Sequence, residues 1–192
     1  MPIKKFVTPG PDSQVCVPFL KLGFLGVLEE PRGYMGGYLI TNAWGQPLEF
    51  RVSNPVQPSR VQQILYGHTL RPYIFAELIS RTLVENAATS VEIIITDSRP
   101  VLDLRRCVRT PMVWLAGKEQ FPRISESGVC EPPVTSVPQG NIYSHPEFAA
   151  DQPIICKLIK QLPNCLDLSE PFQRIREAIG EARKMGIMSR AS

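Results

Sequence analysis

Residues 33–97 constrain the fold most, because they contain two strand patterns, a helical region and a third, apolar strand in that order. Apolar and charged residues alternate over 48–52, which is typical of a strand with one face in solvent. Residues 38–41 form a second apolar run, and turn-forming residues at 42–47 separate the two. The pattern therefore predicts a β-hairpin with a longer loop.

A pair of helices and a buried strand are predicted next. Ser59 is expected to cap a helix with an apolar face of Val61, Ile64 and Leu65 that ends at Gly67, and Thr69 to cap a second helix. The second helix carries an apolar stripe of Phe75, Ala76, Ile79 and Leu83. Residues 91–96 are apolar on both faces apart from Glu92, as expected for an interior strand covered by helices. This order predicts an α/β or α+β fold with a mixed sheet.

The rest of the chain suggests one domain with appendages. The 192 residues are enough for a single core. We expect an irregular N-terminal arm over 1–15 and an α/β core over 16–116. That core has a first strand within 18–28, a loop over 31–37 and its last strand at 112–116. Residues 117–153 are rich in proline and predict a surface loop or linker, and 154–192 predict C-terminal helices that pack back on the core. Phe172, Ile175 and Ile179 are the expected inward-facing residues of the last helix.

Composition narrows the function only slightly. A net charge of +3 neither requires nor excludes nucleic acid. The sequence contains no run of about 18 apolar residues that would predict a membrane span. It also has no apolar segment directly after the first lysines that would predict a secretory signal. Five scattered cysteines are typical of a cytoplasmic chain with reduced thiols. We expect no cofactor.

Asp97 is the main catalytic candidate, because it follows a buried strand, where open α/β sheets place ligand chemistry. The predicted order of elements resembles that of ribonuclease H-like proteins: three early strands, then helices, then a strand ending in Thr-Asp-Ser. That resemblance implies metal-binding carboxylates at the strand end, matched by Asp97, and on the helix, matched by Glu77. The first strand, however, offers Lys21 and glycines rather than a carboxylate, and two helices stand where the family has one. Capping of the following turn is the other role open to Asp97.

One set of residues has the chemistry of a zinc site. Cys130, His145, Cys156 and Cys165 would form a Cys3His ligand set, but no C-x-x-C pair brings two thiolates together. We therefore expect no metal, and interpret the cysteines as buried or idle thiols.

Arginines and loop aromatics are the candidate contact residues. The densest basic cluster is Arg99, Arg105, Arg106 and Arg109, which can bind nucleic-acid phosphates or form ion pairs with Asp103 and local glutamates. Three aromatic residues fall in predicted loops, where large side chains often anchor a partner: Tyr34, Tyr143 and, at the hairpin tip, Trp44.

The sequence thus favours a non-enzymatic cytoplasmic protein that acts as a subunit or adaptor in a multi-protein assembly, with a protein partner or a second copy of itself. Two alternatives remain: a nucleic-acid-directed protein with a divergent ribonuclease H-like core, and a small-molecule enzyme of unrecognised type.

Overall fold

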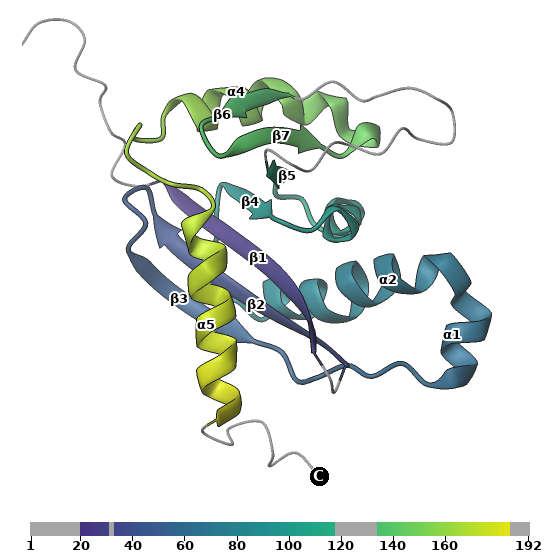
Figure 1. Cartoon of the computed structure of the whole chain (residues 1–192). Coiled ribbons are helices and arrows are strands. Elements are labelled where there is room, and N and C mark those ends of the chain that lie inside the picture. Colours follow the sequence, from purple (N-terminus) through teal and green to yellow (C-terminus); the bar gives the residue numbers. More distant parts are fainter. Residues whose placement is uncertain (1–19, 31–32, 118–133, 185–192) are drawn as a thin grey trace, which may run out of the picture.

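The computed structural model describes residues 20–30, 33–117 and 134–184, and within them seven strands form one mixed sheet with helices on both faces (Figure 1). The strand order is β3-β2-β1-β4-β5-β7-β6. The strands are β1 (Lys21–Glu30), β2 (Gly33–Asn42), β3 (Pro47–Val52), β4 (Ile93–Thr96), β5 (Met112–Gly117), β6 (Thr135–Val137) and β7 (Gly140–Ser144). The predicted α/β class with a mixed sheet is confirmed.

The helical elements lie between and after these strands. They are α1 (Arg60–Tyr66), η1 (Gly67–Thr69), α2 (Leu70–Pro72), η2 (Tyr73–Ser80), α3 (Arg81–Glu85), η3 (Arg99–Arg106), η4 (Pro146–Asp151), α4 (Gln152–Lys160) and α5 (Glu170–Lys184). α2, η2 and α3 follow one another without a break and are called helix 70–85 below. Thr69 does not cap this helix, because its own backbone is already helical and its hydroxyl donates to the Tyr66 carbonyl oxygen at 2.7 Å.

The first three strands form an antiparallel meander, as the hairpin pattern predicts. β2 is longer than expected, however, because residues 33–37 pair with β1 instead of forming a loop. β4 and β5 then continue the sheet on the other side of β1, with β4 parallel to β1 and β5 parallel to β4.

Each face of the sheet is covered by a different set of helices. One face, called the α5 face, packs against α4 and α5 and includes Phe24 and Ile95. The opposite face packs against helix 70–85 and η3 and includes Leu25 and Ile94. This alternation along β1 and β4 explains why residues 22–28 and 93–95 are apolar at every position rather than at every second one. The predicted inward residues of both helices are buried: Phe75, Ala76, Ile79 and Leu83, and Phe172, Ile175 and Ile179.

Glycines in β1 and β2 let the helices approach the sheet closely. A Cβ atom on Gly36 would lie 2.3 Å from Cγ2 of Ile79 on helix 70–85. On the α5 face, a Cβ atom on Gly37 would lie 2.5 Å from Cγ2 of Ile175. The two adjacent glycines therefore serve opposite faces, since successive residues of a strand point to opposite sides.

The proline-bearing segment departs from expectation over its second half. Residues 134–153 contain β6, β7 and η4, so β5 is not the last strand of the sheet. Ile142 of β7 lies in the core of the α5 face and Tyr143 in that of the opposite face. The remainder of this segment, 118–133, and the predicted N-terminal arm lie outside the described residues.

α1 is capped as predicted but is not packed as predicted. Ser59 accepts a hydrogen bond from the Gln62 backbone in a capping box, and Gly67 follows the helix with a φ of 50°. None of the residues of α1 is buried. In Figure 1 the helix stands away from the sheet, beyond helix 70–85.

Candidate functional site

β3 forms one edge of the sheet and exposes large apolar side chains there. Leu48 is 49% exposed and Phe50 is 39% exposed. Phe50 lies on the α5 face, since it pairs with Leu39, a residue of that core, whereas Leu48 falls at a β-bulge where the β2–β3 register shifts. No strand pairs with the outer side of β3 among residues 20–30, 33–117 and 134–184.

The pairing of β3 with β2 determines which backbone groups of β3 face outward. Ser53 donates its N–H to the Gly36 carbonyl oxygen at 2.9 Å, in the register that continues through Arg51 opposite Tyr38. Because hydrogen-bonded pairs alternate along an antiparallel ladder, Arg51 and Glu49 direct their backbone groups toward β2. The N–H and C=O groups of Phe50 and Val52 are therefore the ones presented at the outer edge, and the β-bulge at Leu48 ends this alternation.

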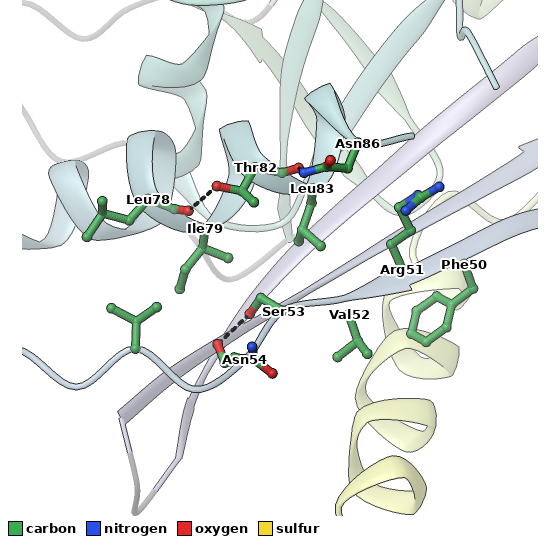
Figure 2. A pocket seen from close by; sticks show the side chains of 11 residues that line it. Phe50, Arg51, Val52, Ser53, Asn54, Leu78, Ile79, Thr82, Leu83 and Asn86 are labelled. Carbon is green, nitrogen blue, oxygen red and sulfur yellow. Dashed lines mark hydrogen bonds between the residues drawn. The ribbon is translucent and has the colours of Figure 1, made fainter. Parts of the chain in front are cut away.

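A groove of about 580 Å³ lies between this edge and helix 70–85 (Figure 2). Ile79 and Leu83 project from the helix toward the segment that follows β3, and Ser53 and Asn54 face them from that segment. The full lining is Phe50, Arg51, Val52, Ser53, Asn54, Val56, Leu78, Ile79, Thr82, Leu83 and Asn86. The groove thus combines apolar walls with uncharged hydrogen-bonding groups, and Arg51 is the only charged residue in its lining.

Glu49 and Arg51 form a fixed charge pair on the groove side of β3. The Arg51 Nε atom lies 2.6 Å from Glu49 Oε1. The Glu49 carboxylate also accepts hydrogen bonds from the backbone N–H groups of Ala88 at 3.0 Å and Thr89 at 2.9 Å. These interactions, with the Ala88 N–H as the largest cause and Arg51 next, lower the pKa of Glu49 to about 2. Glu49 is therefore ionised at neutral pH.

Of the three predicted contact aromatics, the structure exposes Trp44. Trp44 lies in the β2–β3 turn and is 53% exposed, and its backbone N–H donates to Asn42 Oδ1 at 3.0 Å. Tyr34 is instead part of β2, with its ring 5.2 Å from that of Phe75. Tyr143 is part of β7, buried beside Trp114 with ring centroids 5.2 Å apart. The expectation that Tyr34 and Tyr143 lie in loops was wrong, since strand pairing places both against the core.

Asp97 lies directly after β4 and faces α5, where it forms an ion pair with Arg176. Its side chain is 22% exposed and borders a cavity of about 210 Å³ that is also lined by Phe172 and Arg176. Burial raises the pKa of Asp97 above the usual 3.8, and the positive charge of Arg176 opposes part of that rise. The Asp97 side chain accepts no capping hydrogen bond from the turn that follows among the described contacts, where Thr96 Oγ1 instead accepts from the Ser98 N–H at 3.2 Å.

The structure does not bring Asp97 and Glu77 together. Glu77 is an exposed residue of helix 70–85, which covers the face of the sheet opposite α5. No three potential metal-ligating side chains cluster anywhere in the described residues. The carboxylate pair that the ribonuclease H-like resemblance implies is therefore not assembled.

Asp97 gives a testable pH dependence. A raised pKa means that the folded state binds more protons than the unfolded state between pH 3.8 and the folded pKa. The free energy of unfolding is therefore expected to fall as the pH rises through that window. Urea denaturation of the wild type and Asp97→Asn across pH 3.5–7, in steps of about half a unit, measures the difference.

Asp167 provides the control, because its hydrogen bond with Ser169 lowers its pKa. Asp167→Asn should remove a contribution of the opposite sign, one that is present above pH 3.8 and is lost as the pH falls. Identical pH profiles for the wild type and Asp97→Asn would contradict the assignment.

Two of the four clustered arginines are already paired with carboxylates of η4. Arg105 binds Asp151 through two hydrogen bonds of 2.6 and 3.1 Å. Arg106 binds Glu147 at 2.5 Å. Arg99 lies with its guanidinium carbon 6.0 Å from the Trp114 ring centroid, and Arg109 is exposed. The cluster is therefore neutralised in part, by Asp151 and Glu147 of η4.

Two of the candidate zinc ligands, His145 and Cys156, have other partners in the structure. His145 is buried, its Nε2 atom lies 3.3 Å from Asp103 Oδ1 and its Nδ1 atom accepts from the Glu147 N–H. The Cys156 thiol lies 3.7 Å from the Val134 carbonyl oxygen, and Cys165 is an exposed free thiol. Cys130 lies outside the described residues.

The groove beside β3 was not anticipated from the sequence. Its walls come from residues about thirty positions apart, so only the packing of helix 70–85 against β2 creates it. Helices long and apolar enough to cross a membrane do not occur in the described part of the chain. No protein-family model matches this chain, and no curated protein matches it either.

Proposed function

We propose that this chain is a non-enzymatic cytoplasmic protein that acts as a subunit or adaptor in a multi-protein assembly. Its contact site is the edge surface, which we define as Trp44, Leu48, Phe50, the outer backbone of β3 and the adjoining groove. The observation that carries the proposal is the coincidence, on one strand edge, of exposed apolar side chains with backbone groups that no described residue pairs.

Two energetic terms favour docking at such an edge. A partner strand added to β3 would supply the missing main-chain hydrogen bonds, while side-chain contacts would supply selectivity. Burying the exposed parts of Trp44, Leu48 and Phe50 contributes roughly 25 cal/mol per Å² of apolar surface. Aromatic residues are also the ones that most often dominate the binding energy of an interface.

α1 offers further apolar surface close to β3 in sequence. Val61, Ile64 and Leu65 are 63%, 66% and 76% exposed, although Ile64 and Leu65 are residue types that are usually buried. An amphipathic helix whose apolar face meets solvent is typical of an element that packs against another molecule.

The test uses Phe50→Lys, with Ile154→Lys as the matched control. Ile154 is 50% exposed on α4, which lies at the opposite end of the sheet near β6 and β7 (Figure 1). Tagged wild type and both variants are recovered from cells that express the protein, with and without nuclease, and their partners are quantified by mass spectrometry. We expect at least a tenfold loss of a stoichiometric protein partner for Phe50→Lys and no loss for Ile154→Lys.

The same measurement can contradict the proposal. A partner retained equally by both variants would exclude the edge surface as the contact site. Recovery of nucleic acid, with protein partners lost after nuclease treatment, would favour the nucleic-acid alternative and direct attention to the arginine cluster.

A further inference from the structure

We propose that the occupant of the edge surface is a second copy of this chain, joined by antiparallel pairing of the two β3 strands about a two-fold axis at Phe50. This inference rests on the proposed function, and specifies its partner. It would continue the sheet across the dimer and place Phe50 and Val52 of both copies in one row on the α5 face.

Symmetry restricts the possible registers. In an isologous pairing the same surface is used by both copies, so the axis must pass through the centre of the paired segment. Residues directly opposite each other in an antiparallel pair point to the same face. Side chains alternate between faces along one strand, so an axis between two residues would place side chains of opposite faces against each other. The axis must therefore pass through a residue, which then lies opposite the same residue of the other copy. Within the central part of β3 that residue is Glu49, Phe50 or Arg51.

Charge selects Phe50 among the three. An axis at Glu49 would place two carboxylates opposite each other, and an axis at Arg51 would place two guanidinium groups opposite each other, both of which are destabilising. An axis at Phe50 places Glu49 of each copy opposite Arg51 of the other. The strand is then complementary to itself, with an aromatic pair at the centre and two opposite-charge pairs beside it.

The backbone pattern agrees with the same register. Phe50 and Val52 present their N–H and C=O groups outward, as derived from the Ser53–Gly36 hydrogen bond. In the Phe50-centred pairing Phe50 occupies a hydrogen-bonded position and faces Phe50 of the other copy. Glu49 and Arg51 then fall in the non-hydrogen-bonded pairs, where opposing Cα atoms are only about 4.5 Å apart and side chains are closest.

The charges that would pair are held in place before association. The Ala88 and Thr89 N–H groups fix the Glu49 carboxylate, and its side chain is only 15% exposed. Arg51 is already oriented by Glu49 and remains 38% exposed. Its guanidinium has five donors, so one Nε contact within the chain leaves others for a second carboxylate. Little ordering of these side chains is therefore needed when the copies meet.

A disulfide introduced at the axis tests the register directly. Opposing residues in a hydrogen-bonded antiparallel pair have Cα atoms about 5.5 Å apart, which suits a disulfide bond. We expect Phe50→Cys to form a covalent dimer under mild oxidation, seen as a doubled mass on non-reducing gels. The matched control is Ser53→Cys, which would lie about 20 Å from its own copy, since residues advance about 3.3 Å along a strand. Oxidised wild-type protein measures the background of dimers that are cross-linked through the native cysteines.

A second single variant strengthens the same test. Val52→Cys should fail to cross-link, since it would lie about 13 Å from its own copy. Cross-linking of Val52→Cys or of Ser53→Cys would overturn the register.

Sedimentation of the uncross-linked protein provides the second measurement. We expect the wild type to sediment at about twice its 21.5 kDa chain mass. Phe50→Lys, which would place two ammonium groups at the axis, should raise the dimer dissociation constant at least tenfold, and Ile154→Lys should not. A wild type that is monomeric at about 100 µM, together with a Phe50→Cys variant that does not cross-link, overturns the inference. If Phe50→Lys nevertheless abolishes capture of a different protein, the proposed function stands with another occupant, and if it does not, both fail.

Discussion

Replacing Arg105 by methionine is expected to lower the free energy of unfolding by about 3–5 kcal/mol, because it leaves a buried carboxylate without its partner. The Arg105 and Asp151 side chains are only 13% and 9% exposed. Arg105 also donates to the Val108 carbonyl oxygen at 2.7 Å, and its guanidinium lies 4.1 Å from the Phe148 ring centroid. This one side chain therefore ties η3 to η4, segments that lie on either side of β5 and β7 in sequence. Urea denaturation at pH 7 measures the loss.

Two further variants separate the buried charge from a general effect of removing an arginine. Arg106→Met removes the neighbouring pair with Glu147, whose side chains are 54% and 59% exposed, and should cost less than about 1 kcal/mol. The double variant Arg105→Met/Asp151→Leu removes both buried charges and should regain much of the stability lost by Arg105→Met alone. Equal losses of unfolding free energy for Arg105→Met and Arg106→Met would show that burial does not increase the contribution of the Arg105–Asp151 pair to stability.

Gly36→Ala is expected to destabilise the protein by about 1–3 kcal/mol through overpacking. The new Cβ atom would lie 2.3 Å from Ile79 Cγ2 and 3.0 Å from Leu83 Cδ1. Ile79 cannot rotate its Cγ2 atom away at low cost, because β-branched side chains in helices hold one preferred χ1 angle. Relief therefore requires helix 70–85 to move away from the sheet. Thermal and urea denaturation both measure the effect.

The matched control is Gly26→Ala, in the strand next to β2. Its Cβ atom would meet nothing closer than 3.6 Å, an ordinary contact, so the change should be close to neutral. Combining Gly36→Ala with Ile79→Ala should cost less than the sum of the two single changes, since the smaller side chain leaves room for the added methyl group. Strict additivity would argue against the close approach.

The sequence was sufficient for the fold class, because the relevant signals are local. Alternation at 48–52, the apolar stripe of helix 70–85 and the apolar run ending at Thr96 each depend on neighbours within a few positions. The glycines at 33–37 led to the wrong prediction of a loop for a physical reason. Glycine-rich stretches are typical of loops, whereas here Gly36 and Gly37 lack side chains because helices occupy that space on both faces. β6 and β7 were missed because they are short and a proline lies between them.

The candidate site shows a second property that a local sequence pattern does not predict, namely which side chains of an edge strand are exposed. Alternation along β3 suggests that Glu49 lies in solvent and Phe50 in the core, yet Glu49 is 15% exposed at its side chain and Phe50 is 39% exposed. The inversion arises because β3 is the outer strand of the sheet, where an apolar side chain has a neighbour on one side only. Which strand lies at the edge is decided by pairing between segments far apart in the chain. The exposure of Trp44, by contrast, follows from the turn alone.

The order of the strands also determines whether association can stop. β3 and β6 are the two outermost strands among the described residues, and β6 spans only Thr135–Val137. If β3 of one copy paired with β6 of the next, every addition would leave a fresh edge, and growth would be open-ended. Pairing β3 with β3 uses the long edge of both copies at once and leaves two short ones outward, which are poor templates for further strands. The β3 edge through which a monomer associates would then be buried in the dimer. Association would therefore stop at two copies instead of continuing into a fibre.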